Sequence, residues 1–358
     1  MRRNYYLFSP GNLRRKDNTL VFQPSVDVGN QAETTGEEAE LLAGSDAEIA
    51  HGEYGQKRVI PVDDVDSMYV FSEMTFNTRF FNWLSQKRIP LHMFNWHGFY
   101  TGSWYPKEYL NSGFLLVHQV QYYQRKPRRL ALARAIIDAA SFNMAKNLKY
   151  YNSRGVGAAD ALQRIETYRE QLTAVSEIDE LMGVEGNIRQ AYYSAFPQIL
   201  KDKFDFEKRV KNPPDNAVNA LISFGNAMVY TACLSEIYRT QLSPLISFLH
   251  EPGQRRFSLA LDLAEIFKPL FADRIIFRLL NQNMISHGDF DRHLNYCHLK
   301  PKGRKVFVQA FEEKMKSTFK HRTIKRHVSY RRLIRLECYK LIKHITGAED
   351  YKGFRAWW

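Results

Sequence analysis

Two glutamates, an aspartate and a histidine stand in local contexts that could prepare a metal centre. Glu185 follows Gly183 in the stretch EGNIRQAYYSAF, near the start of a predicted helix. His250 ends an apolar stretch and precedes a Glu-Pro-Gly turn, so we expect it to project from a loop. Asp262 and Glu265 are three residues apart and share one face of a predicted helix. Carboxylate oxygens together with one imidazole suit a hard divalent cation.

Each of these residues also has a structural interpretation that the sequence leaves open. A single histidine at the end of an apolar run is commonly a hydrogen-bonded structural residue, and an Asp-x-x-Glu pair on a helix is commonly solvated. Sequence alone does not bring Glu185 to His250, because 65 positions separate them. The pattern therefore indicates locally prepared ligands, and the metal centre is a hypothesis.

Basic residues surround these candidate ligands in the sequence. Arg189 and Lys268 follow the two candidate glutamates by four and three positions, on the same predicted helix faces. Arg255 and Arg256 occupy the loop between the histidine and the aspartate. Residues 299–345 carry 15 Lys or Arg and only three acidic residues. These side chains are candidates for contact with nucleic-acid phosphates, and a solvated surface is the alternative for each.

The net charge of +13 is unevenly distributed along the chain. Residues 24–56 contain eight acidic side chains and five glycines, with no Lys or Arg. Without them, thirty acidic residues remain against 51 basic ones, a net charge of +21. That excess favours phosphate backbones or anionic membrane surfaces as partners. We expect residues 24–56 to be a mobile acidic insertion, either a solvated loop without a role or a flap that competes with DNA.

The cysteines and the apolar segments of the sequence indicate the cellular compartment. The three cysteines are far apart and form no CxxC pair, so neither a disulfide framework nor a thiolate zinc site is supported. The N-terminus lacks the apolar core of a signal peptide. The longest uncharged run, 217–235, is interrupted by polar residues and is predicted to be a buried helix. We expect a cytoplasmic protein that does not associate with membranes.

The pattern of elements predicts an α+β fold. A small β-rich N-terminal domain, 1–106, is expected to precede a linker, 107–112, and a larger, mostly α-helical catalytic domain, 113–358. Strands are predicted at 5–8, 20–22, 58–62, 68–71 and 91–95, where β-branched and aromatic residues gather.

The spacing of apolar residues predicts helices in both domains. One helix in the N-terminal domain is marked by apolar residues between 76 and 84, after a possible cap at Ser72 or Thr75. In the larger domain, we predict helices beginning at Pro127, at 161–181, at 185–196 and at 218–242. A last helix is marked by apolar residues at 334, 338, 341 and 345.

Segments along nearly the whole chain resemble the Cas-one family, the CRISPR-associated spacer-acquisition integrase and endonuclease. YYLFSPGNLRRKDNTLVF is similar to the opening hairpin of that family, and EGNIRQAYYSAF to its first catalytic motif. SFLHEPGQRRFSLALDLAEIFKPLFAD resembles its combined histidine and acid motif, and YRRLIRLECYKLIKHI its closing helix. The motifs occur in the order of the family. The acidic residues 24–56 depart from its compact hairpin.

The resemblance implies that Glu185, His250 and Glu265 ligate Mg²⁺ or Mn²⁺, with Asp262 a nearby catalytic acid whose direct ligation it leaves open. It implies that a DNA 3′-hydroxyl attacks a repeat phosphodiester, which inserts spacer DNA into a CRISPR array, and that attack by water gives cleavage. Double-stranded DNA, a second copy of the chain in a homodimer and a small ferredoxin-like adaptation protein are the implied partners. Two alternatives stay open: a structure-selective nuclease for branched DNA, and a non-catalytic DNA-binding scaffold.

Overall fold

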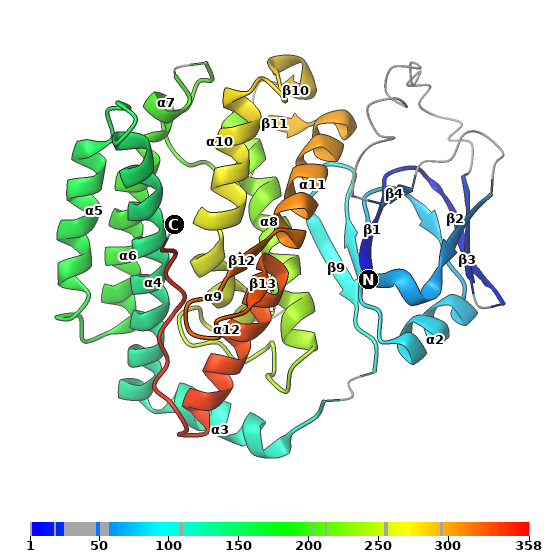
Figure 1. Ribbon diagram of the computed structural model, residues 1–358, viewed down its shortest axis with the longest axis horizontal. Coiled ribbons are helices and arrows are strands. Elements are labelled where there is room, and N and C mark those ends of the chain that lie inside the picture. Colours follow the sequence, from blue (N-terminus) through cyan, green and yellow to red (C-terminus); the bar gives the residue numbers. More distant parts are fainter. Residues whose placement is uncertain are drawn as a thin grey trace. The chain divides into compact units, whose positions relative to one another are not determined.

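The computed structural model describes residues 2–17, 19–24, 57–107, 110–201, 203–211, 213–253, 257–293 and 296–357, together with the backbone of 48–50. The chain divides into two compact units (Figure 1). The first comprises Met1–Tyr109 and Lys300–Glu313, and the second comprises Leu110–Leu299 and Lys314–Trp358. The N-terminal region is rich in strands and the remainder is rich in helices, which confirms the predicted α+β fold.

The strand-rich unit contains two sheets. In the first sheet the strand order is β4-β1-β6-β8-β9, with parallel pairing from β4 to β8 and an antiparallel β9. In the second the order is β5-β3-β2-β7, and only β2 and β7 pair in parallel. The bounds are β1 Arg3–Leu7, β2 Gly11–Lys16, β3 Thr19–Pro24, β4 Glu48–Ala50, β5 Arg58–Pro61, η1 Val62–Asp64, β6 Val65–Val70, β7 Met74–Thr75, β8 Leu91–Phe94 and β9 Tyr100–Trp104.

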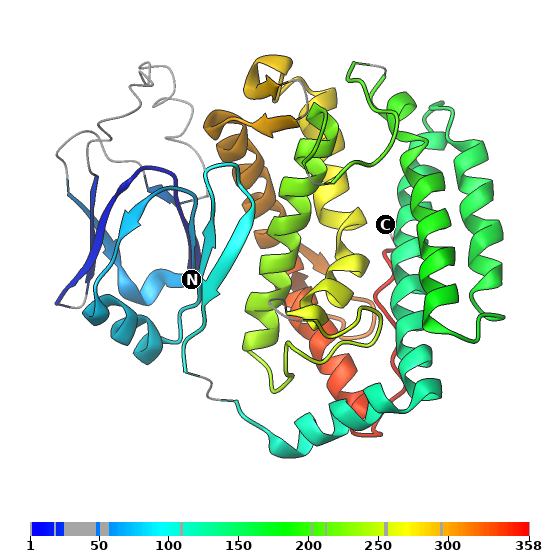
Figure 2. The same ribbon diagram turned by 180° about the vertical axis from the view of Figure 1, so that it is seen from behind.

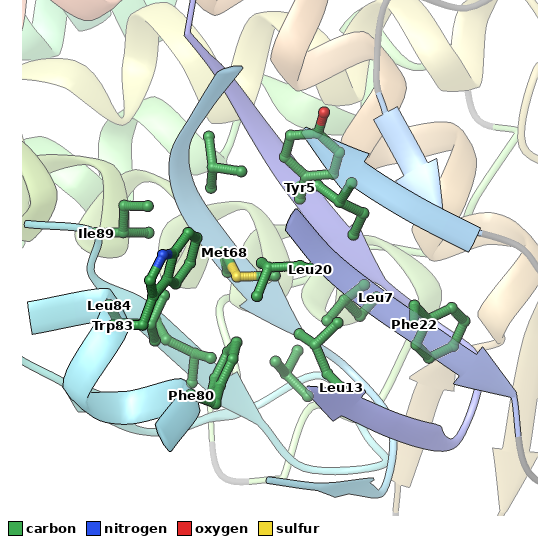
Figure 3. Close-up of a cluster of buried hydrophobic side chains, with 14 residues drawn as sticks. Tyr5, Leu7, Leu13, Leu20, Phe22, Met68, Phe80, Trp83, Leu84 and Ile89 are labelled. Carbon is green, nitrogen blue, oxygen red and sulfur yellow. The ribbon is translucent and has the colours of Figure 1, made fainter. Parts of the chain in front are cut away.

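One helix, α2 (Thr78–Lys87), packs its apolar face into the core of this unit. Its buried residues Phe80, Trp83 and Leu84 meet Leu7 and Leu13 from the two sheets (Figure 3). The helix begins after Asn77, whose side chain accepts a hydrogen bond from Phe80 N at 3.0 Å. The predicted caps at 72 and 75 were therefore wrong, because the residue next to the first turn supplies the acceptor.

The second unit consists mainly of helices. Their bounds are α3 Gly113–Gln124, α4 Lys126–Asn152, α5 Ala159–Gln171, α6 Ile178–Tyr193, α7 Phe196–Ile199, α8 Ala217–Tyr238, α9 Ser258–Phe267, the π-helix η2 Pro269–Asp273, α10 Arg274–Asn281, η3 His287–Asp289 and α12 Tyr330–Ile345. Helix α11, Pro301–Lys316, belongs to the first unit up to Glu313. Two hairpins complete the unit: β10 Phe290–His293 with β11 Tyr296–Leu299, and β12 Thr318–Lys320 with β13 His327–Ser329.

Helix α8 forms the centre of this unit and packs against α9 and α12. It is the one described helix that is long and apolar enough to cross a membrane, and 83% of its most apolar window is buried inside the protein. We therefore assign α8 to the core, as the sequence predicted.

The helix that carries Glu185 starts earlier than predicted. The expected helix over 161–181 is two elements, because α5 ends at Gln171 and α6 begins at Ile178. A capping box formed by Glu177 and Glu180 starts α6. Glu185 consequently lies in the middle of α6 and not near its start. Helical backbone therefore continues on both sides of this residue.

Candidate active site

Helix α6 places Glu185 and Arg189 on one face. Ile188 and Tyr192, three and seven residues after Glu185, flank this face and are buried in the core, each 1% exposed. The side chains of Glu185 and Arg189, four residues apart, form an ion pair through Nε of the guanidinium. Only 14% of the Glu185 side chain is exposed, so this carboxylate is fixed rather than solvated.

Asp262 builds the turn that carries His250. Its fully buried carboxylate accepts backbone N–H groups from Phe248 at 2.6 Å, Leu249 at 3.0 Å and His250 at 3.0 Å. It also lies 2.8 Å from Nδ1 of the His250 ring. These donors offset the cost of burying the carboxylate. With Nδ1–H donated to Asp262, the lone pair on Nε2 stays available to another ligand.

Glu265 brings the two halves of the site together. Its Oε1 lies 3.9 Å from His250 Nε2 and 2.7 Å from Lys268 Nζ. Its Oε2 pairs with the second guanidinium nitrogen of Arg189, which also holds Glu185. Glu265 sits one helical turn after Asp262 on α9, so the buried helix presents both acids to the same side. The acids of α9 are thus buried and paired, and not a solvated helix face.

The oxygen and nitrogen ligands of this site suit a hard divalent cation, but the Arg189 guanidinium already lies between the carboxylates of Glu185 and Glu265. Two carboxylates and one imidazole with a free Nε2 are ligands that Mg²⁺ or Mn²⁺ accepts. The Arg189 guanidinium holds both glutamates in the arrangement described here. Within the described ranges, no group of three or more His, Cys, Asp and Glu residues is arranged to hold a metal ion. Ligation by both glutamates therefore requires Arg189 to release at least one of them.

Two further buried charges lie near these residues, the predicted Lys268 and Asp273, which the sequence analysis did not single out. Asp273, 3% exposed, lies at the end of η2, and its Oδ1 has no hydrogen-bond partner among the described residues. Burial raises the pKa of Asp273 to about 7, and a hydrogen bond from Tyr192 opposes the shift. Burial, followed by repulsion from Arg189, lowers the pKa of Lys268 to about 7.

The structure brings together six of the eight predicted site residues. Glu185, Arg189, His250, Asp262, Glu265 and Lys268 are linked by the contacts given above. Arg255 and Arg256 lie outside the described residues.

Tyrosines near the site belong to the core. Tyr192, Tyr193 and Tyr330 are at most 9% exposed, so they are core residues rather than free surfaces on which a base could stack.

The family model described as CRISPR associated protein Cas1 matches residues 5–313. A CRISPR-associated endonuclease Cas1 of Fusobacterium nucleatum subsp. nucleatum is 47% identical over 358 residues, which cover 100% of this chain and 98% of that protein. A CRISPR-associated endonuclease Cas1 2 of Moorella thermoacetica is 46% identical over 356 residues, covering 99% and 100%.

Solved structures give the same result for the fold. A Cas1 protein from Thermotoga maritima superposes with a TM-score of 0.81 at 39% identity and covers 99% of this chain and 100% of that chain. A casposase bound to integration product has a TM-score of 0.82 at 19% identity, with 98% and 92% covered, and this second likeness concerns the fold alone. The family match over most of the chain and the high identity over its whole length show that the chain belongs to the CRISPR associated protein Cas1 family.

Proposed function

We propose that the protein is a divalent-metal-dependent DNA endonuclease and integrase that inserts spacer DNA into a CRISPR array. The observation that carries this proposal is the convergence of Glu185, His250 and Glu265 from three separate segments onto one buried, charged site. Relatives that are 46–47% identical over nearly their whole length bear the name CRISPR-associated endonuclease Cas1, which supports the nuclease activity.

Glu185, Glu265 and Nε2 of His250 would hold Mg²⁺ or Mn²⁺. A divalent cation there supplies charge neutralisation at the phosphodiester and lowers the pKa of the attacking hydroxyl or water. Asp262 keeps the His250 ring in the tautomer and orientation that point Nε2 towards Glu265. Asp262 itself acts through His250 in this scheme, because its oxygens are occupied by the backbone of residues 248–250.

The cationic side chains at the site would receive the DNA phosphate. When Arg189 leaves a carboxylate to an ion, its guanidinium is free to bind a non-bridging phosphate oxygen. Lys268 lies beside Glu265 and can neutralise the same phosphate. Arg255 and Arg256, which follow His250 in the sequence, would extend this contact along the DNA backbone. Double-stranded DNA is therefore the substrate we propose, bound largely without regard to sequence.

The homodimer and a small ferredoxin-like adaptation partner belong to the same proposal, as does a cytoplasmic location. A Cas6-RT-Cas1–Cas2 complex shares the fold with a TM-score of 0.78 at 17% identity. The strongly basic composition supports a nucleic-acid assembly.

A strand-transfer assay tests this function. A labelled short duplex with free 3′-hydroxyl ends is incubated with a plasmid that bears a repeat, or with a scrambled plasmid, in Mn²⁺, Mg²⁺ or EDTA. The reaction is run with and without the small partner protein. We expect metal-dependent joining that prefers the repeat and needs the partner. Cutting of branched DNA without joining would support a general nuclease, and tight binding without either reaction would support a scaffold.

A further inference from the structure

The chain changes its helical hydrogen-bond pattern directly after the catalytic helix. α9 ends at Phe267, and Pro269 has no N–H to donate to the preceding turn. η2 continues as a π-helix, in which Asp273 N donates to Lys268 O at 3.1 Å. In an α-helix that N–H would reach the Pro269 carbonyl, four residues earlier. The Pro269 carbonyl thus does not receive the Asp273 N–H and can accept a donor from another part of the chain.

Asn147 of α4 supplies that donor. Its buried Nδ2 donates to Pro269 O at 2.8 Å and to the Tyr192 hydroxyl at 2.9 Å. Its Oδ1 accepts from Nε of Arg274 at 2.7 Å. One amide thus ties α4 to α6, which carries Glu185, to the first residue of η2 and to the first residue of α10.

Asn143, one helical turn earlier on α4, holds the catalytic helix itself. Its Nδ2, fully buried, donates to Ile266 O and to Phe354 O, each at 3.0 Å. Its Oδ1 accepts from Ala356 N at 2.9 Å. Ile266 directly follows Glu265, so a single side chain joins the backbone next to the catalytic glutamate to the C-terminal segment.

The C-terminal segment, 349–357, is fastened independently along α12 and α4. Its course beside α4 is visible in both views (Figures 1 and 2). The buried Glu337 carboxylate accepts from the Tyr351 hydroxyl at 2.7 Å and from Phe354 N at 3.0 Å. Arg355 pairs with Asp138 of α4. These bonds give the segment a defined position from which it can brace Asn143.

Close packing joins the same elements. A Cβ at Gly353 would lie 2.5 Å from Ala139 Cβ, 3.0 Å from Ala135 O and 3.7 Å from Ile266 Cδ1. The segment therefore touches α4 and the side chain that follows Glu265, with no room for a methyl group.

We propose that Asn143 and Asn147 are positioning residues for the phosphodiester reaction, and that the C-terminal segment 349–357 is the brace that fixes Asn143. This inference rests on the proposed function of the site. The asparagines hold the backbone at Ile266, within the Glu265–Lys268 stretch, and at Pro269, directly after it, and so set where the glutamate and the lysine project. Because nucleophile and phosphate must align closely, a small displacement of Glu265 lowers the rate without lowering DNA affinity.

Asn143→Leu tests the proposal, because leucine has a similar size and no polar atom. We expect kcat for strand transfer at saturating Mn²⁺ to fall about 10–100-fold, as for other residues that orient metal ligands, while KM for DNA changes less than about twofold. Amide hydrogen exchange should quicken both in 258–273 and in 349–357. Leu172→Ala, a buried truncation at the end of α5, is the control for lost stability.

A second pair of variants keeps the test decisive where Asn143→Leu folds poorly. Gly353→Ala should lower kcat, and Ala139→Gly combined with it should restore part of the loss, because the closest clash is then removed. A kcat within about twofold of wild type for Asn143→Leu, or an equal loss in Leu172→Ala at the same melting temperature, would overturn the proposal. Faster exchange confined to 349–357 would overturn it as well.

The exchange measurement is independent of catalysis. A wild-type protein that failed to join DNA in Mn²⁺ would contradict the proposed function. Faster amide exchange of both 258–273 and 349–357 in Asn143→Leu would still support the brace in that case. If the wild type joins DNA but Asn143→Leu quickens exchange in only one of the two segments, the brace alone is overturned.

Discussion

The Arg189 guanidinium pairs with the carboxylates of both Glu185 and Glu265, and Lys268 is a second cation beside Glu265. We expect Arg189→Gln to lower the free energy of unfolding by about 3 kcal/mol in EDTA, because it leaves Glu185 buried without its ion pair and Glu265 with Lys268 as its remaining cation. In saturating Mn²⁺ the loss should be clearly smaller, since the ion replaces the lost charge. Thermal and denaturant unfolding in the two conditions measure the difference.

Arg164→Gln is the matched control for this substitution. Arg164 pairs with Asp160 at 4.0 Å on an exposed helix face, so its removal should cost less than about 1 kcal/mol in either condition. An equal effect of Mn²⁺ on the Arg189 variant, the Arg164 variant and wild type would mean that no ion binds between the two glutamates.

Asp273 gives the protein a defined pH dependence of stability. Its pKa is raised by burial to about 7 from an ordinary value of 3.8, so the folded chain binds more protons than the unfolded chain between those values. The contribution of Asp273 to stability is therefore present below about pH 4 and is lost as the pH rises to about 7.

Asp273→Asn should abolish this loss. We expect the free energy of unfolding of the variant, relative to wild type, to increase between pH 4 and pH 7 and to level off above pH 7. Urea unfolding across that range measures the difference between the two proteins. A difference that stays constant with pH would show that Asp273 is ionised throughout.

At the scale of elements, the sequence predicted most of the regular structure of the described chain. The predicted strands at 5–8, 20–22, 58–62, 68–71 and 91–95 overlap β1, β3, β5, β6 and β8. Apolar spacing also located α4, α8 and α12. β2 was missed because only Gly11 and Leu13 of its sequence GNLRRK are buried, between exposed polar residues. β4 and β7 were missed because they are only three and two residues long, too short to show an alternating pattern.

The sequence allowed the individual site residues to be predicted, but not the contacts that they make with one another. Spacing placed Asp262 and Glu265 on one helix face, but it did not predict that both are buried. Nothing in the spacing showed that Asp262 gathers the backbone of residues 248–250, because these bonds depend on how a loop folds over a helix. Asn143 and Asn147 donate hydrogen bonds to the Ile266 and Pro269 carbonyls, more than 120 positions away in the sequence. A local sequence pattern cannot predict contacts over that separation.

The entry into β2 illustrates a local requirement with a measurable cost. A Cβ at Gly11 would lie 2.6 Å from Gln23 O and 2.7 Å from the Phe22 ring. We expect Gly11→Ala to destabilise the strand-rich unit by about 1–3 kcal/mol, because neither the backbone nor the buried ring can move away freely. Gly102→Ala in β9, whose added Cβ would meet only Met93 Cε at 3.9 Å, should change stability little. Similar melting temperatures for the two variants would contradict this packing.

At the scale of the whole molecule, charge governs the encounter with DNA. The β12–β13 hairpin lies in the basic region 299–345 and exposes Lys320, Lys325 and Arg326. Changing the three to Gln should weaken binding equally for unrelated duplex sequences. The slope of log K against log salt should fall in magnitude by about 2–3, if each cation neutralises one phosphate. Fluorescence anisotropy between 50 and 200 mM salt measures both quantities.

The control for this variant changes Arg14, Arg15 and Lys16 of β2 to Gln. These cations are also exposed but lie outside the basic region. An equal change of slope in the two triple variants would mean that overall charge, and not the hairpin, sets DNA binding.

The central claim is that the site built by Glu185, His250 and Glu265 performs metal-dependent phosphodiester chemistry. The most direct test is single-turnover joining of a labelled duplex to repeat DNA by wild type and by His250→Ala, in Mn²⁺ and in EDTA, with DNA affinity measured in parallel. His287→Ala, at an exposed histidine of η3, serves as the control. We predict joining that needs Mn²⁺ and falls at least about 100-fold in His250→Ala, with unchanged DNA affinity. Joining by His250→Ala at the rate of wild type, or joining by wild type in EDTA, would contradict the claim.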